Sequence, residues 1–131
     1  MFVGRWQPFH NGHKWLISQK LDRNIPVLIC VRDIEPDERN PFTTRQTVSM
    51  IETVYQDEDV AVMIIPDIES VNYGRGVGYE INEHVPGASV SSVSATSIRN
   101  CIQNGDTSWR HQVDEKIHDT VSAYLTANNN L

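Results

Sequence analysis

The sequence predicts an α/β protein with a Rossmann-like, three-layer fold built around a mostly parallel sheet. Short apolar runs alternate with helical patterns, an order that gives parallel strands joined by right-handed crossovers. Residues 26–31 and 60–65 are continuous apolar runs, typical of strands covered on both faces. The 131 residues suit one compact core. We therefore expect a single domain over residues 1–127 and a frayed tail over 128–131, which is mostly asparagine.

The first half of the chain contains the clearest elements. In order, we expect a strand over 1–3, a helix over 11–21, a strand over 26–31, a helix over 43–55 and a buried strand over 60–65. Thr43 and Gln46 have the spacing of a capping box, which places the start of the second helix. The charged, proline-containing stretch 32–41 is expected to be a loop.

The second half is less regular. In order, we expect an irregular stretch over 66–79, a short helix over 80–85, a strand over 89–93, a helix over 96–104 and a final helix over 114–127. Gly105 suits the left-handed position that closes a helix. Ile117, Val121 and Leu125 recur at helical spacing and should form the buried face of the last helix.

Composition narrows the classes of function. The hydrophobic fraction of 39% and the charged fraction of 21% are ordinary for a globular protein. The net charge of −6 argues against general nucleic-acid binding. No run approaches the ~20 apolar residues of a membrane span, and no signal peptide is visible. Two cysteines do not make a disulfide framework, so the cytoplasm is the expected location.

Residues 4–13 (G-R-W-Q-P-F-H-N-G-H) have the features of a phosphate site. They lie between the first strand and the first helix, where backbone N–H groups carry partial positive charge that favours anions. His10 and His13 are three residues apart and can face one ligand. Gly12 has no Cβ to keep a phosphate from the backbone. The same two histidines could instead be half of a metal site, or helix caps.

This segment resembles the G-R-F-Q-P-F-H-x-G-H signature of the nucleotidylyltransferase superfamily, especially the archaeal-type nicotinamide mononucleotide adenylyltransferases. Trp6 stands where phenylalanine is usual. The resemblance implies a fold of the nucleotidylyltransferase type and places His10 and His13 against the α- and β-phosphates. It also implies a nucleotide-binding set in this segment made of Gly4, Arg5, Trp6, Gln7, Phe9, Gly12 and Lys14.

Residues 93–99 (V-S-A-T-S-I-R) have the features of a second anion site, because small hydroxyl residues precede a helix. Thr96 can cap this helix and donate to phosphate, and Arg99 can place its fork of donors on phosphate oxygens. The segment resembles the family's second signature, I-S-S-T-x-x-R, with Ala95 in place of a serine. The resemblance implies that Lys14, Thr96 and Arg99 hold the β- and γ-phosphates. Ser94 and Ser97 complete the expected set.

The resemblance extends to residues 40–43 with Arg45, to 65–68 and to 105–109, but departs from the family before the second signature. Twenty residues separate Tyr73 from Ser94, too few for a further βαβ crossover. The acceptor substrate is therefore left open. The glycine-rich loop 72–79 either covers a ligand or is a flexible connection. Arg45, Tyr73 and Arg75 are the candidates for binding the acceptor.

The implied reaction is the transfer of a nucleoside monophosphate to a phosphate-bearing acceptor, with release of pyrophosphate. ATP and nicotinamide mononucleotide are the first choice of substrates, and Mg²⁺ would be bound mainly through the triphosphate, without a dedicated protein metal site. The alternatives are a cytidylyltransferase that uses CTP and a nucleotide-binding regulatory module without turnover. The sequence predicts neither a nucleic-acid nor a membrane partner and leaves a homo-oligomer open.

Overall fold

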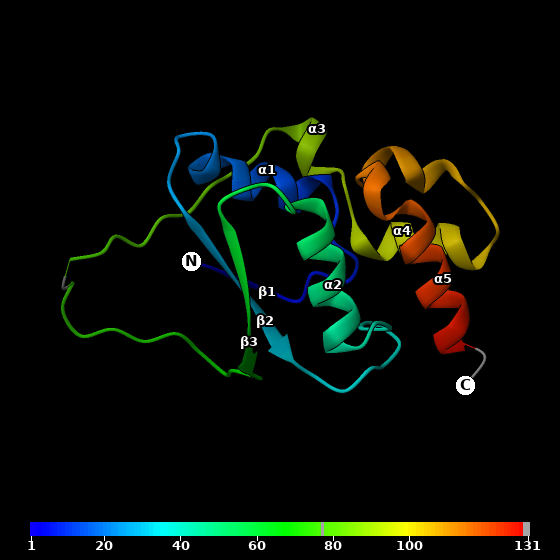
Figure 1. Cartoon of the computed structure of the whole chain (residues 1–131), viewed down its shortest axis with the longest axis horizontal. Helices are drawn as coiled ribbons and strands as arrows, with labels where there is room; N and C mark the ends of the chain where they lie inside the picture. Colours follow the sequence, from blue (N-terminus) through cyan, green and yellow to red (C-terminus); the bar gives the residue numbers. More distant parts are fainter. Residues whose placement is uncertain (77, 130–131) are drawn as a thin grey trace.

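The computed structural model describes residues 1–76 and 78–129, and it contains a parallel sheet of three strands (Figure 1). The strands are β1 (Phe2–Gly4), β2 (Val27–Asp33) and β3 (Val60–Pro66), in the order β1-β2-β3. Val3 pairs with Cys30, and Cys30 pairs with Met63. The α/β class, the parallel sheet and the Rossmann-like alternation predicted from the sequence are confirmed.

Two helices connect the strands. Helix α1 (Asn11–Leu21) joins β1 to β2, and α2 (Thr44–Val54) joins β2 to β3. The predicted capping box of α2 is confirmed: the Thr43 hydroxyl accepts from the Gln46 backbone N–H, and the Gln46 side chain accepts from the Thr43 N–H. These bonds satisfy two donors that have no partner inside the helix.

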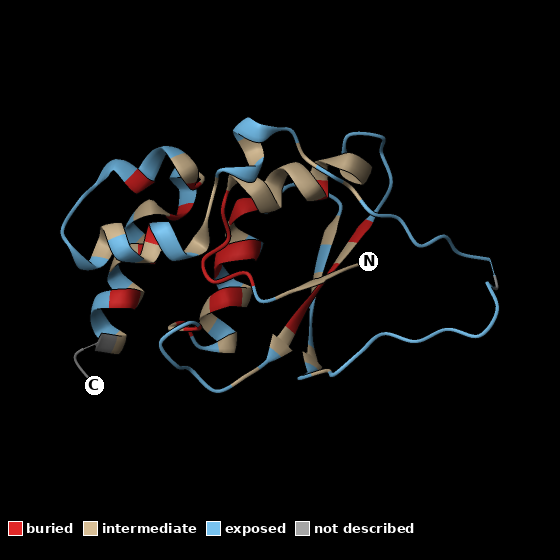
Figure 2. Ribbon diagram, turned by 180° about the vertical axis from the view of Figure 1, so that it is seen from behind, coloured by how far each residue is buried: buried red, intermediate tan, exposed pale blue. Residues whose placement is uncertain are grey.

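The hydrophobic core lies on one face of the sheet (Figure 2). Ile29 and Val31 of β2 are buried in the same cluster as Ile17 of α1 and Ile51 of α2. Right-handed crossovers between strands in sequential order bring successive helices to the same face. Of the three expected layers, the described residues therefore form the sheet and one helical layer.

Strand β3 is an edge strand, and the expectation that it is buried was wrong. Met63 and Ile64 are each 47% exposed. Its apolar run resembles that of a central strand, but β3 has a neighbour on one side only. The apolar composition of a strand does not reveal its position in the sheet.

The segment between β3 and α3 (Ala88–Ser91) differs most from the sequence-based expectations. It extends away from the rest of the molecule (Figure 1). The helix expected over 80–85 is absent from these described residues, because so short a helix needs packing partners. The strand expected over 89–93 was also wrong, because most of that segment lies in or beside α3. There the Ser91 and Ser92 hydroxyls bond to carbonyls three residues earlier, which competes with an extended backbone.

Helix α4 (Ala95–Gln103) begins at Ser94, whose hydroxyl accepts from the Ser97 N–H. Ser94 rather than Thr96 is therefore the cap. Gly105 has the predicted left-handed conformation, with φ of +73°. Two short 3-10 helices follow, η1 (Ser108–Gln112) and η2 (Glu115–Ile117).

Helix α5 (His118–Asn129) completes the described fold, and Ile117, Val121 and Leu125 are buried as predicted. The tail expected from residue 128 differs, because Asn128 still lies in α5 and donates to the Pro41 carbonyl at 2.7 Å. Residues 130 and 131 lie outside the described residues. Within the described part of the chain, every helix is too short or too polar to cross a membrane.

Gly105 allows a test of the helix ending. We expect Gly105→Ala to lower the free energy of unfolding by about 1–2 kcal/mol, because alanine is strained at positive φ. Gly74→Ala is the control, since a Cβ there also meets open space but φ is ordinary. Chemical denaturation measures both variants. If Gly105→Ala is as stable as Gly74→Ala, the assignment of Gly105 as the residue that ends α4 is contradicted.

Candidate active site

The side chains of His10 and His13 stack at the start of α1. Their ring centroids are 3.7 Å apart and the ring planes differ by 14°. The Nδ1 atom of His10 accepts from the backbone N–H groups of Gly12 and His13, at 3.0 and 3.4 Å. The Nδ1 atom of His13 accepts from the His10 backbone N–H at 3.2 Å. The two histidines thus form a reciprocal cap for α1.

This cap fixes the proton position on both rings. An Nδ1 atom that accepts a hydrogen bond is unprotonated, so each neutral ring carries its proton on Nε2. Burial lowers the pKa of His10 to about 4. Burial, and secondarily the neighbouring His10, lowers the pKa of His13 well below its ordinary value. Both rings are therefore neutral at pH 7 and offer Nε2–H as a donor.

The histidine pair rests on two buried aromatic rings. Trp6 meets His13 edge-on with centroids 4.8 Å apart, and Phe9 stacks on His13 at 5.4 Å. The Trp6 indole N–H donates to the Cys30 carbonyl at 3.1 Å, which ties the segment to β2. Trp6 and Phe9 are only 3% and 0% exposed, so His13 packs on two rings that belong to the hydrophobic core.

Both glycines of the motif make room for these rings. A Cβ on Gly4 would lie 2.9 Å from the Trp6 indole, and a Cβ on Gly12 would lie 2.8 Å from Cε1 of His10. Side chains at these positions would displace the rings they touch. In this structure Gly12 is explained by the position of the His10 ring.

Gln7 and Arg99 join three segments that are far apart in the sequence. The buried Gln7 amide donates to the Phe42 carbonyl at 3.2 Å and accepts from the Phe42 N–H at 3.0 Å. Nη1 of Arg99 donates to the Gln7 carbonyl at 2.8 Å, and Nη2 donates to the Thr96 hydroxyl at 3.3 Å. The second motif is thereby held against the first.

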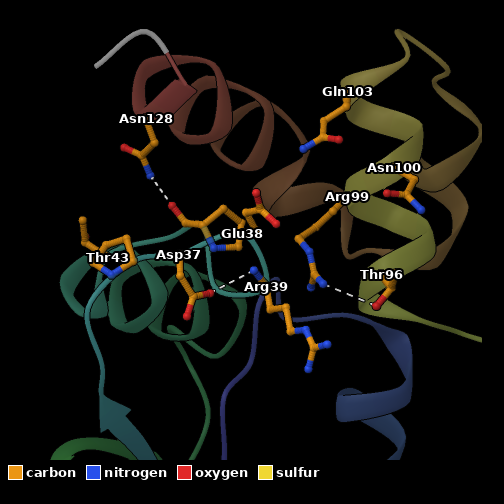
Figure 3. Close-up of a pocket in the computed structure, with 11 residues that line it drawn as sticks. Asp37, Glu38, Arg39, Thr43, Thr96, Arg99, Asn100, Gln103 and Asn128 are labelled. Carbon is orange, nitrogen blue, oxygen red and sulfur yellow. Dashed lines mark hydrogen bonds between the residues drawn. The ribbon is translucent and has the colours of Figure 1, made fainter.

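A cavity of about 700 Å³ opens beside Arg99. Residues of α4 form one wall, and the loop before α2 forms another (Figure 3). The Asp37 carboxylate accepts from the backbone N–H groups of Arg39 and Asn40 and from the Asn40 amide, so it orders this loop. These hydrogen bonds lower the pKa of Asp37.

Arg39 is a candidate site residue that sequence reasoning missed. Its side chain extends into the space that Arg99 also faces (Figure 3). The ion pairs among the described residues are Lys14–Asp114 and Arg32–Asp67, so neither Arg39 nor Arg99 has a carboxylate partner there. Two such guanidinium groups at one cavity favour an anionic ligand. The only signal in the sequence was the position of Arg39 directly before the 40–43 segment.

Several expected site residues lie elsewhere. Lys14 forms an ion pair with Asp114 at 2.7 Å and lines a different, smaller cavity. Tyr73 is 62% exposed and, with Arg75, lies in the extended segment after β3. Arg5 and Arg45 are exposed. The structure therefore brings together the two motifs but not the expected acceptor residues.

The site offers oriented donors and positive charge. Two neutral Nε2–H groups and two guanidinium groups can stabilise charge on phosphate oxygens. The described residues include no group of three or more histidine, cysteine, aspartate or glutamate side chains placed to hold a metal ion. The fold and the site together are those of an α/β protein suited to phosphate chemistry.

Comparison with curated proteins agrees with this class. The nicotinamide-nucleotide adenylyltransferase of Methanocorpusculum labreanum is 37% identical over 68 residues, which are 50% of this chain and 40% of that protein. The enzyme of the same name from Methanospirillum hungatei is 31% identical over 55% of this chain and 42% of its own length. The enzyme of the same name from Picrophilus torridus is 33% identical over 53% of this chain and 43% of its own length.

These similarities confirm the resemblance to nucleotidylyltransferases, and to the archaeal nicotinamide-nucleotide adenylyltransferases in particular. The matched region spans less than half the length of these relatives. No protein-family model matches the chain.

The lowered pKa values predict a loss of stability in mild acid. The unfolded chain takes up protons at its histidines below about pH 6.5, whereas folded His10 does so only near pH 4. We expect the free energy of unfolding to fall as the pH drops from 6.5 to 4, by up to about 1.4 kcal/mol per pH unit for each histidine. Urea denaturation at several pH values measures this slope.

His10→Asn tests the cause, because asparagine caps helices well but does not titrate. This variant should lose less stability than the wild type over the same pH range. His84→Asn, in the segment between β3 and α3, is the matched control and should keep the wild-type slope. If His10→Asn also keeps the wild-type slope, the titration of the histidine pair does not cause the loss of stability in acid.

Proposed function

We propose that this chain provides the active site of a nucleotidylyltransferase that transfers AMP from ATP to nicotinamide mononucleotide or a similar phosphate-bearing acceptor. The observation that carries the proposal is the stacked pair of neutral histidines in the same segment whose Gln7 carbonyl accepts from Arg99. Curated relatives of this chain are named nicotinamide-nucleotide adenylyltransferases, which supports this choice of substrates.

In this proposal a phosphate oxygen of the acceptor attacks the α-phosphorus of ATP. A new P–O bond forms, the bond from the α-phosphorus to the bridging oxygen breaks, and pyrophosphate leaves with that electron pair. The acceptor phosphate is already ionised, so the chain needs no general base. Catalysis then depends on position and on the stabilisation of developing charge.

The residues divide between the reacting phosphate and the leaving group. The Nε2–H groups of His10 and His13 donate to the α- and β-phosphates. Arg99 and Thr96 hold the β- and γ-phosphates, and Arg39 joins them from the facing loop. The hydroxyls of Ser94 and Ser97 and the exposed Arg5 are further candidates for phosphate contacts.

The remaining predicted residues fit less direct roles. We assign Gly4, Trp6, Gln7, Phe9 and Gly12 to positioning the histidines and Arg99. Four of them contact these groups directly, and Gly4 leaves room for the Trp6 ring that packs on His13. Lys14 would have to leave Asp114 to reach a phosphate. Arg45, Tyr73 and Arg75 remain candidates for the acceptor, but Tyr73 and Arg75 would have to approach the site together with loop 72–79.

Magnesium fits this site as a partner of the triphosphate. It prefers oxygen ligands and keeps several waters, so phosphate oxygens can supply most of its coordination. When bound, the ion would neutralise part of the triphosphate charge.

The proposal also covers the cellular location and the partners of the protein. Free Cys30 and Cys101 fit a reducing compartment, and we retain the cytoplasm as the expected location. A small phosphorylated acceptor remains the expected partner, without nucleic acid or membrane, and a homo-oligomer remains open.

Pyrophosphate release tests the proposal directly. The purified chain is assayed with ATP or CTP, Mg²⁺ and a panel of phosphorylated acceptors that includes nicotinamide mononucleotide. We expect turnover with ATP and nicotinamide mononucleotide. His13→Asn should reduce it by ~10²–10³-fold, because asparagine can accept from the His10 N–H but has no Nε2–H donor. Turnover only with CTP would identify a cytidylyltransferase, and triphosphate binding without turnover would identify a regulatory module.

Arg99 gives a test of the phosphate assignment. Arg99→Lys should raise the KM for the triphosphate, because an ammonium group cannot replace the fork that contacts Gln7 and Thr96. The KM for the acceptor should change little. Arg110→Lys, on the exposed η1 helix, is the matched control. A changed acceptor KM with an unchanged triphosphate KM would place Arg99 on the acceptor side.

A further inference from the structure

The last turn of α5 is hydrogen-bonded to the loop before α2, the loop that carries Arg39 (Figure 3). The Asn128 amide donates to the Pro41 carbonyl at 2.7 Å and to the Gln46 side-chain oxygen at 2.8 Å. The Asn128 side-chain oxygen accepts from the Gln46 amide at 3.2 Å. Both ends of the Asn128 amide are therefore bonded, which holds this side chain in one orientation.

The Pro41 carbonyl lies at the junction between two parts of this loop. On one side, Phe42 is fully buried and its backbone is bound to the first motif. On the other side, the backbones of Asp37 and Asn40 bond to each other and close a turn that contains Arg39. The peptide unit between Pro41 and Phe42 joins the turn to the buried anchor. The hydrogen bond from α5 fixes that peptide unit, and with it the direction in which the turn projects.

The position of this turn matters because Arg39 and Arg99 face the same cavity (Figure 3). Burial, and to a smaller extent the charge of Arg39, lowers the pKa of Arg99, whereas Asp37 raises it. Two guanidinium groups repel each other, so repulsion favours a loop position farther from Arg99. A fixed Pro41 carbonyl opposes that movement. Asn128 also lines the cavity but is uncharged, so its removal leaves the charge of the cavity unchanged.

We propose that Asn128 is a positioning residue that holds Arg39 beside Arg99, so that the last turn of α5 sets the affinity of the cavity for phosphate groups. The inference rests on the proposed function and deepens it, because it gives α5 a part in triphosphate binding. Asn128 acts through the loop rather than on the phosphates, since its amide is already bonded to Pro41 and Gln46.

The experiment measures binding of Mg²⁺–pyrophosphate to the full chain by calorimetry. Asn128→Ala should raise the dissociation constant by about three- to tenfold, the range expected for one hydrogen bond. Arg39→Ala should weaken binding at least as much, because it removes the cation itself. The double variant should bind no more weakly than Arg39→Ala alone, because contributions that pass through one group are not additive. Thr126→Ala, at an exposed position of α5, is the matched control and should bind as the wild type does.

Steady-state kinetics distinguish positioning from a general loss of structure. In the proposed reaction, Asn128→Ala should raise the KM for the triphosphate and leave kcat close to the wild-type value. Partial unfolding would instead lower the fraction of active protein, which reduces the apparent kcat and leaves KM unchanged. Asn128→Leu, which keeps the size of the side chain but removes the amide, should behave as Asn128→Ala does.

The outcomes separate this inference from the function on which it rests. Additive losses in the double variant would overturn the inference alone, because Asn128 would then act independently of Arg39. Wild-type affinity in Asn128→Ala would also overturn it, while pyrophosphate binding by the wild type would still support the phosphate site. If the wild type binds no pyrophosphate, the proposed function fails together with the inference.

Discussion

The reciprocal cap between His10 and His13 is the contact on which the site depends. It satisfies backbone donors at the start of α1 that have no partner within the helix. The same bonds occupy Nδ1 of both rings and leave the two Nε2–H groups as donors. The same hydrogen bonds therefore cap the start of α1 and orient the two imidazole donors. The backbone N–H groups of Gly12 and His13, which sequence reasoning left free for a phosphate, are already bonded to His10.

Arg99 extends this arrangement to the second motif. It donates to the Gln7 carbonyl, while the Gln7 side chain is bound to the backbone of Phe42. The three segments that contain Gln7, Phe42 and Arg99 are thus fixed to one another through Gln7. Since Gln7 is buried, these hydrogen bonds are shielded from competing water, and loss of either partner would leave a buried polar group unpaired. The guanidinium of Arg99 is oriented before any ligand arrives.

The sequence predicted what local chemistry determines and missed what packing determines. Apolar periodicity and the Thr43–Gln46 pair located α1, α2 and all three strands closely. The serines at 89–92 were mistaken for a strand, because their hydroxyl bonds to earlier carbonyls cannot be inferred from alternation. Lys14 sits beside the histidines in sequence, but its partner Asp114 is 100 residues away. Arg39 was missed because its proximity to Arg99 depends on how the loop before α2 folds.

The division between neutral histidines and charged arginines follows from where each group lies. Two imidazolium rings with centroids 3.7 Å apart would repel each other, and burial already disfavours the charged form of each. The pair is therefore neutral, and in the proposed reaction it would supply two oriented donors that need no reorganisation when charge develops beside them. A leaving pyrophosphate gains more charge and requires a permanent cation. In the proposed reaction Arg99 and Arg39 would be these cations, because guanidinium stays protonated even when partly buried. In the proposed site, the start of α1 thus supplies the oriented neutral donors, and the wall of the larger cavity supplies the positive charge.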